Sequence, residues 1–296
     1  MNKNLYVCFD IGGTAIKYGL INEKGVFIEK NTIATEAKLG AKHIVQTLKT
    51  IIHSYVQQKP IKGIAISTAG IVDYKQGEVV FAYPENFPGY SGTKWKVILE
   101  AEFNLPCAVE NDVNCAALGE LWLGAGKDKN SLFAITVGTG IGGCAVINQK
   151  VIHGACNSAG EIASLRLPNG SLEKIASVTK LVDDVAKTKG LKPSDLDGKK
   201  IFAWVKEGDI VAKQAIDNLV NNLSDGIANI VAILNPQVII LGGGIMAQQA
   251  YLKPLIEEAL QARLLPNVYA HTEIAFAKLA NDAGMLGALY NLLHNN

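Results

Sequence analysis

The stretch Cys8–Lys17, read as CFDIGGTAIK, contains the end of a buried strand, two adjacent glycines and the start of a second strand. Glycine permits positive φ and has no side chain, so Gly12 and Gly13 let backbone N–H groups converge on an anion such as phosphate. Thr14 adds a hydroxyl donor, and we count Lys17 among the residues that bind phosphate. A tight hairpin turn is the alternative, because glycine serves such turns equally well.

The composition is that of an ordinary globular chain. Its 296 residues are 49% hydrophobic, which is enough to bury a large core in one or two domains. The 28 basic and 27 acidic residues leave a net charge of +1, so no overall field favours nucleic acid or an anionic membrane. Because the start of the chain lacks the apolar run of a signal peptide and no segment reaches spanning length, we expect a cytoplasmic protein with no nucleic-acid or membrane partner.

The cysteines are scattered and odd in number, and no two form a C-x-x-C pair. This spacing argues against a disulfide framework and against a zinc knuckle. We therefore predict buried free thiols at Cys8, Cys107, Cys115, Cys144 and Cys156.

Two halves of the chain repeat one order of strands and helices. The first has three β-type runs with a turn at residues 22–25, then an amphipathic helix and a further strand. The second has strands around a glycine turn, a long apolar helical stripe that ends before Pro236, and another strand. We predict an α/β protein with two similar lobes around a cleft. The expected strands are Leu5–Asp10, Ala15–Ile21, Val26–Thr32, Ile61–Ser67, Leu132–Val137, Cys144–Asn148, Gln149–Ile152 and Val238–Leu241, and the expected helices include Ala41–Val56 and Ile216–Leu234.

A second glycine turn, GTGIGG at Gly138–Gly143, combines glycines and a threonine as the first one does. We predict phosphate binding here as well, with a simple hairpin turn again as the alternative. The residues concerned are Gly138, Thr139, Gly140 and Gly142. The turn also matches the dinucleotide pattern G-x-G-x-x-G. That pattern must open a helix, whereas Cys144–Ile152 has the alternation of a hairpin, so we discard a dinucleotide site.

Two aspartates lie at strand ends where chemistry is expected. Asp112 stands between a strand and a probable helix, where an N-cap is the common interpretation. The functional alternative is a carboxylate that accepts a proton from an alcohol during phosphoryl transfer. Asp10, at the mouth of the first glycine turn, is better suited to Mg²⁺ held through water, or to stabilising the turn itself.

Six segments spread over nearly the whole chain carry recognisable motifs: DIGGT at Asp10–Thr14, ENDVNCAALGE at Glu110–Glu120, TVGTGIGG at Thr136–Gly143, AGEI at Ala159–Ile162, LGGG at Leu241–Gly244 and NDAGMLGA at Asn281–Ala288. In this order they resemble the motifs of the ROK sugar kinases (repressor, ORF, kinase) in the actin and hexokinase superfamily. The resemblance implies two actin-like, ribonuclease H-like lobes, each a mixed five-stranded sheet with helices, with ATP and sugar in the cleft. The first lobe would comprise residues 1–115 and a C-terminal helix at about 282–296, and the second residues 116–281.

The same resemblance implies an activity and its residues. Family members transfer a phosphoryl group from ATP, which carries Mg²⁺, to a sugar 6-hydroxyl, and Asp112 corresponds to the general base. The residues that correspond to sugar-binding positions are Gly70, Asn86, Asn111, Asp112 and Glu161, and those that correspond to the adenosine shelf are Gly242, Gly243 and Gly244. A proline turn at Asn86 and a solvated loop acid at Glu161 are the simpler alternatives.

The chain departs from the family pattern after Glu161. Most members continue E-x-G-H into a cysteine-rich zinc loop, whereas this chain has Ser164 at the histidine position and no cysteine before Glu173. The resemblance therefore implies no structural zinc site, and it makes Glu173 a second candidate for binding sugar. The loss is most similar to the β-glucoside kinase branch, with N-acetylmannosamine kinase and glucokinase as alternatives.

A sugar-sensing repressor of the same family is a further alternative. Such regulators carry a helix-turn-helix segment before the DIGGT motif, whereas nine residues precede Asp10 here. We expect an enzyme, and the family's habit implies a homodimer.

Overall fold

The computed structural model describes residues 4–294 and divides them into two compact units. The first contains the residues up to Lys127, the segment His153–Ala159 and the residues from Asn281 on; the second contains Asp128–Ile152 and Gly160–Ala280. The predicted boundary at residues 115 and 116 falls inside helix α3 (Asp112–Leu123), which stays whole in the first unit. Residues 1–3 and 295–296 of the predicted first lobe lie outside the described part.

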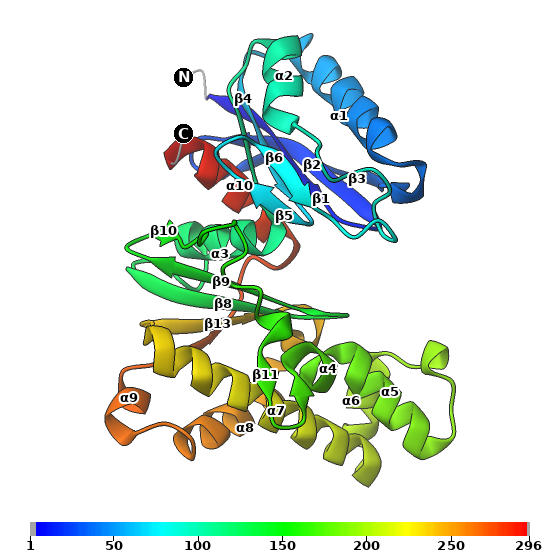
Figure 1. Cartoon of the computed structure of the whole chain (residues 1–296), viewed down its shortest axis with the longest axis vertical. Coiled ribbons are helices and arrows are strands. Elements are labelled where there is room, and N and C mark those ends of the chain that lie inside the picture. The colour runs from blue at the N-terminus through cyan, green and yellow to red at the C-terminus, as the bar shows by residue number, and fades with distance from the viewer. Residues whose placement is uncertain (1–3, 295–296) are drawn as a thin grey trace. The chain divides into compact units, whose positions relative to one another are not determined.

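The first unit is built on a sheet with strand order β3-β2-β1-β4-β7 (Figure 1). β1, β2 and β3 are antiparallel neighbours, and β4 and β7 run parallel to β1, so the sheet is mixed. A small hairpin, β5 (Ile71–Asp73) with β6 (Glu78–Phe81), follows β4. The sheet strands are β1 (Leu5–Ile11), β2 (Ala15–Asn22), β3 (Phe27–Ala34), β4 (Ile61–Thr68) and β7 (Cys107–Asn111), and the other helices are α1 (Ala41–Val56), α2 (Trp95–Phe103) and α10 (Ala283–His294), with a 3-10 turn at Ala37–Leu39.

The second unit repeats this plan with strand order β10-β9-β8-β13-β14, where β13 and β14 are the parallel strands. The prediction of two α/β lobes, each with a mixed five-stranded sheet, is confirmed. The strands are β8 (Ser131–Val137), β9 (Ile141–Ile147), β10 (Lys150–Val151), β13 (Val238–Gly242) and β14 (Glu273–Phe276), with the small hairpin β11 (Arg166–Leu167) and β12 (Gly170–Ser171). The helices are α4 (Leu172–Ala176), α5 (Val178–Lys189), α6 (Gly198–Lys206), α7 (Ile210–Leu234), α8 (Gln249–Gln261) and α9 (Pro266–Ala270), and 3-10 turns lie at Ile162–Ser164, Pro193–Asp195 and Gly244–Gln248. A further 3-10 turn, Ala280–Asp282, spans the boundary between the units.

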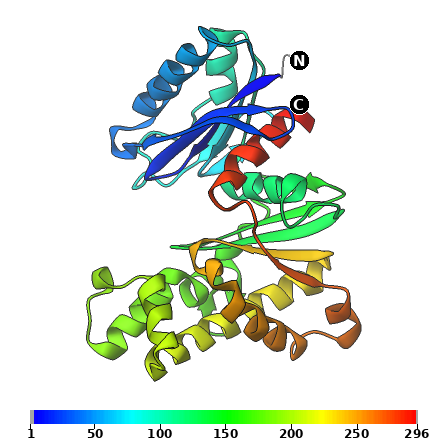
Figure 2. The same cartoon turned by 180° about the vertical axis from the view of Figure 1, so that it is seen from behind.

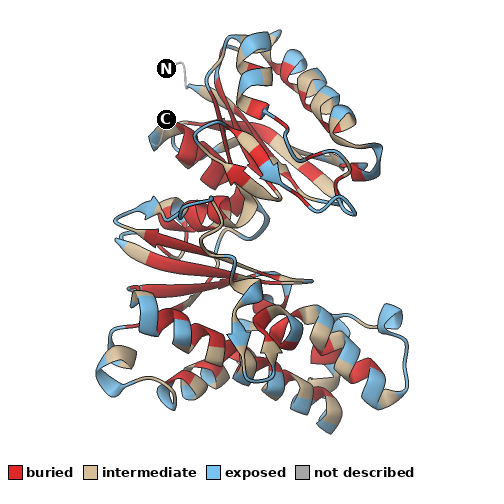
Figure 3. Cartoon of the chain, viewed as in Figure 1, coloured by how far each residue is buried: buried red, intermediate tan, exposed pale blue. Residues whose placement is uncertain are grey.

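Each unit has its own core, formed by one face of its helices and by the central strands (Figure 3). The apolar stripe predicted for α7 is buried from Ile216 to Val231, and the helix ends where Asn235 adopts a left-handed conformation. In the first unit, α10 packs on α3 (Figure 2). Glycines allow this close approach, because a Cβ on Gly119 would lie 2.5 Å from the carbonyl oxygen of Ala283. No helix within residues 4–294 is both long and apolar enough to cross a membrane.

The parallel strands of each sheet end in register, which places the turns after them at one edge. In the first unit Ile11 is paired with Thr68, and Thr68 with Asn111, so the first glycine turn, Gly70 and Asp112 all follow that edge. In the second unit Thr136 is paired with Gly242, so the second glycine turn and the glycines after β13 follow the corresponding edge. The carboxyl ends of parallel strands are where ligands bind in open α/β sheets.

Candidate functional site

The strand-to-helix junction at Asp112 is fixed by its neighbour. The side-chain Oδ1 of Asn111 accepts hydrogen bonds from the backbone N–H groups of Val113 and Asn114, at 2.9 and 3.1 Å, so Asn111 is the N-cap of α3. Asp112 is the first residue of the helix, and its interpretation as the N-cap is wrong. Because Asn111 caps the helix, the carboxylate of Asp112 is not needed for that purpose.

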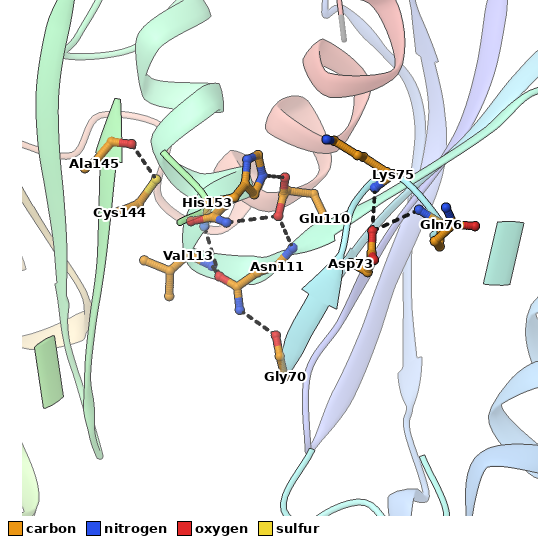
Figure 4. Close-up of polar contacts among 11 residues, drawn as sticks. Gly70, Asp73, Lys75, Gln76, Glu110, Asn111, Val113, Cys144, Ala145 and His153 are labelled. Carbon is orange, nitrogen blue, oxygen red and sulfur yellow. Dashed lines mark hydrogen bonds and ion pairs between the residues drawn. The ribbon is translucent and has the colours of Figure 1, made fainter. Parts of the chain in front are cut away.

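Three residues predicted to contact sugar, Gly70, Asn111 and Asp112, form one hydrogen-bonded chain in the first unit. Figure 4 shows its contact between Asn111 and Gly70. Nδ2 of Asn111 donates to the carbonyl oxygen of Gly70 at 2.9 Å and to Oδ1 of Asp112 at 3.0 Å. The backbone N–H of Val113 donates to the same Asp112 oxygen at 2.9 Å. Gly70 has φ +102°, and a Cβ there would lie 2.6 Å from the carbonyl oxygen of Phe81, so only glycine fits this position. The network orients the Asp112 carboxylate at the edge of the sheet.

A buried contact between a glutamate and a histidine, beside this chain, was not foreseen from the sequence. The Glu110 side chain is 1% exposed, and its Oε2 lies 2.7 Å from Nε2 of His153 (Figure 4). Its Oε1 accepts from the backbone N–H of Asn111 and from Nδ2 of Asn114, at 2.8 and 2.9 Å. The only sequence signal was the acidic residue two positions before Asp112. Its partner is 43 residues further along the chain.

The first glycine turn does not use positive φ, which corrects our expectation. Neither Gly12 nor Gly13 has a positive φ angle. What Gly13 provides is space, since the atoms nearest to a Cβ there would be those of the Phe87 ring at 3.9 Å. Gly13 and Thr14 line a pocket of about 710 Å³ that Asn86 also lines. A residue predicted to bind sugar therefore shares a pocket with two predicted to bind phosphate.

Asp10, at the end of β1, is held by two partners. Its Oδ1 accepts from the Ser67 hydroxyl at 2.7 Å, and its Oδ2 pairs with Nζ of Lys17 at 3.2 Å. A Cβ on Gly284 would lie 2.7 Å from the Asp10 carboxyl carbon, so glycine is needed where α10 begins. Lys17 is thus held beside Asp10, close to the turn for which both were predicted.

The second glycine turn lines a pocket in the second unit. Gly138 and Thr139 share this pocket of about 250 Å³ with Gly244, the last residue of the predicted adenosine shelf. Gly140 and Gly142 also have no positive φ, whereas Gly243 has φ +100°. The sequence had not indicated the remaining lining residues, which come from segments without a recognisable motif: Val178, Asp197, Gly198, Lys199, Phe202, Ile245 and Gln248.

Glu161 and Glu173 interact in the second unit. Desolvation of the Glu161 carboxyl group, and then the negative charge of Glu173, raise the pKa of Glu161, although much of this residue is exposed. Oε2 of Glu173 accepts a hydrogen bond from the backbone N–H of Ile141 at 3.1 Å. Ser164, which stands at the family's histidine position, donates through Oγ to the carbonyl oxygen of Glu161 at 3.1 Å. Within residues 4–294, no three His, Cys, Asp or Glu side chains are grouped so that they could hold a metal ion.

Comparisons with known proteins agree with this architecture. Residues 6–295 match the ROK family. The chain is 31% identical to a glucokinase of Halalkalibacterium halodurans, over 97% of this chain and 94% of that protein. It is 30% identical to a beta-glucoside kinase of Listeria monocytogenes, over 96% of each. The structure superposes on a ROK family glucokinase from Streptomyces griseus, solved in complex with glucose and AMPPNP, with a TM-score of 0.81, 27% identity and coverage of 97% and 98% of the two chains. With its fold, its motifs and nearly its whole length matched, the chain belongs to the ROK family.

Proposed function

We propose that the chain is an ATP-dependent sugar kinase that phosphorylates the 6-hydroxyl of a glucose-type sugar, with a β-glucoside such as cellobiose as the best candidate. The observation that carries the proposal is the pocket in the first unit, because Gly13 and Thr14, from the predicted phosphate turn, line it together with Asn86, from the predicted sugar loop. A kinase needs this proximity, since the sugar hydroxyl must reach the phosphorus atom. The sugar kinases among the relatives support the same reaction class.

Asp112 is suited to the general-base role. It lies on the same sheet edge as the first glycine turn, and Asn111 and Val113 fix one of its oxygens. In the proposed step the 6-hydroxyl oxygen attacks the γ-phosphorus of ATP. The new sugar O–P bond forms while the bond between the γ-phosphorus and the bridging oxygen of ADP breaks, and the hydroxyl proton passes to the Asp112 carboxylate. ADP leaves with the electron pair of the broken bond.

The remaining predicted residues have roles consistent with this step. We assign the sugar hydroxyls to Gly70, Asn86, Asn111 and Glu161, and the nucleotide to the pocket of Gly138, Thr139 and Gly244, whose Phe202 and Ile245 offer an apolar wall for a base. Asp10 fits a Mg²⁺ ion that accompanies ATP, because a carboxylate has about four lone-pair sites and the hydrogen bonds from Lys17 and Ser67 use only part of them. Such an ion would neutralise phosphate charge. The homodimer and the cytoplasmic location remain predictions.

The choice of a β-glucoside follows from the short loop after Glu161. From Arg166 to Ser171 the chain forms only a short hairpin, whose two strands have two residues each. Ser164 stands at the position where the family motif has a histidine. We infer more room at the anomeric end of the sugar, where a glucoside carries its substituent. Glucose itself is the second candidate, favoured by the relative and the solved structure that are glucokinases. N-acetylmannosamine, an alternative from the sequence analysis, is the third candidate.

A coupled assay of ADP release tests the proposal. We would compare kcat/KM for cellobiose, methyl β-glucoside, glucose and N-acetylmannosamine, and locate the new phosphate by ³¹P and ¹³C NMR. Phosphorylation at carbon 6 supports the kinase assignment, and a preference for glucosides supports the substrate. Preference of tenfold or more for N-acetylmannosamine over every glucoside, about 1.4 kcal/mol in transition-state binding, would exclude the glucoside assignment. No turnover of any sugar would exclude the enzyme and favour a sugar-sensing role.

A further inference from the structure

We propose that His153 is a positioning residue: it clamps the segment His153–Ala159 onto Glu110 and through Glu110 orders the junction that carries Asp112. The inference rests on the proposed function, because it assigns a task toward the same catalytic step. His153 belongs to no motif that we identified and has no role in the phosphoryl transfer described above.

The clamp is made of contacts to a carboxylate that has no access to water. Glu110 is 1% exposed, and three groups donate to it: the backbone N–H of Asn111, Nδ2 of Asn114 and Nε2 of His153. Of these three partners, the imidazole of His153 is the one that comes from outside the junction. Without His153, Glu110 Oε2 would lose the donor that lies 2.7 Å away. A buried acceptor without its partner costs free energy, and more so when it is charged.

Tyr74 holds the imidazole from its flat side. The rings of Tyr74 and His153 stack with their centroids 3.6 Å apart and their planes 11° from parallel. Nζ of Lys75 lies 5.8 Å from the centroid of the Tyr74 ring. The His153 side chain is 13% exposed, so its orientation is fixed by one ring and one carboxylate and little by solvent. Tyr74 follows β5, so the clamp joins two regions of the first unit to the segment.

The segment that His153 holds leads directly to Glu161. The segment His153–Ala159 belongs to the first unit, although the residues on both sides of it belong to the second. The end of the segment contacts its start, because the backbone N–H of Ala159 donates to the carbonyl oxygen of His153 at 3.1 Å. Glu161, a proposed sugar contact, follows two residues later. One side chain, His153, therefore fixes both the start of the loop that leads to Glu161 and the carboxylate that supports the Asp112 junction.

The chain contains its own matched control. His53 and Glu102 form a second His–Glu pair in the first unit, with Nε2 and Oε1 2.8 Å apart, but their side chains are 53% and 29% exposed. Solvent can replace that pair, so His53→Ala removes an equivalent contact at little cost in stability.

The chain also contains a site for a spectroscopic probe. Cys156 lies within the clamped segment and is the exposed cysteine, whereas Cys8, Cys107, Cys115 and Cys144 are buried. The expectation of a buried thiol is thus wrong for Cys156, because its segment lies at the surface.

The experiment compares the full-length wild type with His153→Ala, His153→Gln and His53→Ala. A nitroxide label on Cys156 reports the order of the segment by EPR without any need for activity, and steady-state kinetics report kcat and KM for sugar. We expect His153→Ala to sharpen the EPR lines and to lower kcat by about ten- to a hundredfold, the scale of a lost hydrogen bond to a charged group. His153→Gln, which keeps an N–H donor, should recover part of kcat, and His53→Ala should match the wild type.

Wild-type kcat and KM in folded His153→Ala would overturn the proposal, whether or not its melting temperature falls, because a purely structural role predicts that pattern. If circular dichroism shows that the alanine variant is unfolded, His153→Gln decides: label order and kcat should be kept together or fall together, and a change in one without the other would also overturn the proposal. Failure of the proposed function looks different, because the wild type would then turn over no sugar while the EPR comparison still tests the clamp.

Discussion

The carboxylate of Glu173 accepts a hydrogen bond from the backbone N–H of Ile141, at 3.1 Å, within the second glycine turn. A Cβ on Gly140 would overlap the same carboxylate oxygen, so the glycine leaves room for the acid. The turn that we predicted for phosphate thus receives a negative side chain from within the second unit. Glu173 also acts on Glu161, whose pKa it helps to raise.

Glu173→Gln should remove this repulsion and keep the hydrogen bond, because the glutamine oxygen can still accept from Ile141. The raised pKa means that the folded protein binds the Glu161 proton more tightly than the unfolded chain. The stability that comes from this proton is present at low pH and is lost as pH rises from the ordinary glutamate range through the folded pKa. Glu173→Gln should therefore equal the wild type near pH 4 and exceed it at pH 7, by less than about 1 kcal/mol because Glu161 is exposed.

Thermal unfolding of both proteins between pH 4 and pH 8 provides the check. The difference in melting temperature should grow in favour of Glu173→Gln as the pH rises. A difference that shrinks or changes sign over this interval would mean that Glu173 stabilises Glu161. Glu173→Ala serves as the control for loss of the contact with Ile141, and it should be less stable than Glu173→Gln at every pH.

Asp112→Asn should keep the fold and ATP binding and lower kcat by about two to four orders of magnitude, the usual contribution of a general base. Its amide oxygen can still accept from Asn111 and Val113, which donate to Oδ1 of the native carboxylate. Rapid-quench or coupled-assay kinetics measure kcat, and calorimetry measures ATP affinity. Turnover near the wild-type rate would remove Asp112 from the base role. Asp73→Asn is the matched control, since Asp73 caps an exposed turn through Lys75 and Gln76.

Local patterns in the sequence were sufficient for much of the fold. The antiparallel strands β1 to β3 and the buried stripe of α7 were predicted. Both the alternation of a strand and the periodicity of a helix are patterns among residues that are close together in the sequence. The start of β9 was placed three residues late, at Cys144 instead of Ile141, because two glycines were assigned to the turn. Gly143 lies inside that strand for a different reason: a Cβ there would be 2.8 Å from the carbonyl oxygen of Gly160.

The features that could not be predicted from the sequence depend on contacts between residues that are far apart in the chain. Glu110 and His153 meet across 43 residues, and nothing in either neighbourhood indicates the partner. The pocket beside Gly138 includes Phe202 and Gln248, which come from segments that are distant in the sequence. The register of the parallel strands brings such segments to one edge, and a single sequence does not contain that register.

Gly13→Val tests the first glycine turn as a phosphate cradle. Gly13 has no positive φ, and the nearest atoms to its Cβ would be 3.9 Å away, so the variant should fold. Its methyl groups would project into the pocket that Gly13 shares with Thr14 and Asn86. We expect ATP affinity to fall by tenfold or more, about 1.4 kcal/mol, in nucleotide titrations of a variant with native circular dichroism. Unchanged affinity in the folded variant would favour the hairpin interpretation. Gly19→Ala gives the contrast, because its Cβ would overlap the backbone of Glu29 and should lower the melting temperature.

Ser164→His should narrow the choice of sugar. Ser164 lies in the 3-10 turn after Glu161 and donates to its carbonyl oxygen at 3.1 Å. An imidazole there would restore the side chain that the family motif has at this position, without the zinc loop. It would occupy the space that we assign to the substituent of a glucoside and would offer a donor to a free anomeric hydroxyl. A site that can hydrogen-bond a hydroxyl selects against substrates that lack it, because its own polar group is left unpaired.

The expected result for Ser164→His is a loss in kcat/KM for cellobiose and methyl β-glucoside of about tenfold relative to glucose, the size of one hydrogen bond in selectivity. The coupled assay measures all three sugars on one preparation. Ser194→His is the control, since Ser194 is an exposed serine in another 3-10 turn of the second unit and should leave the ratio unchanged. An equal effect on the glucosides and on glucose would mean that position 164 does not face the anomeric end. The room for a β-glucoside would then have to come from elsewhere in the loop between Leu165 and Glu173.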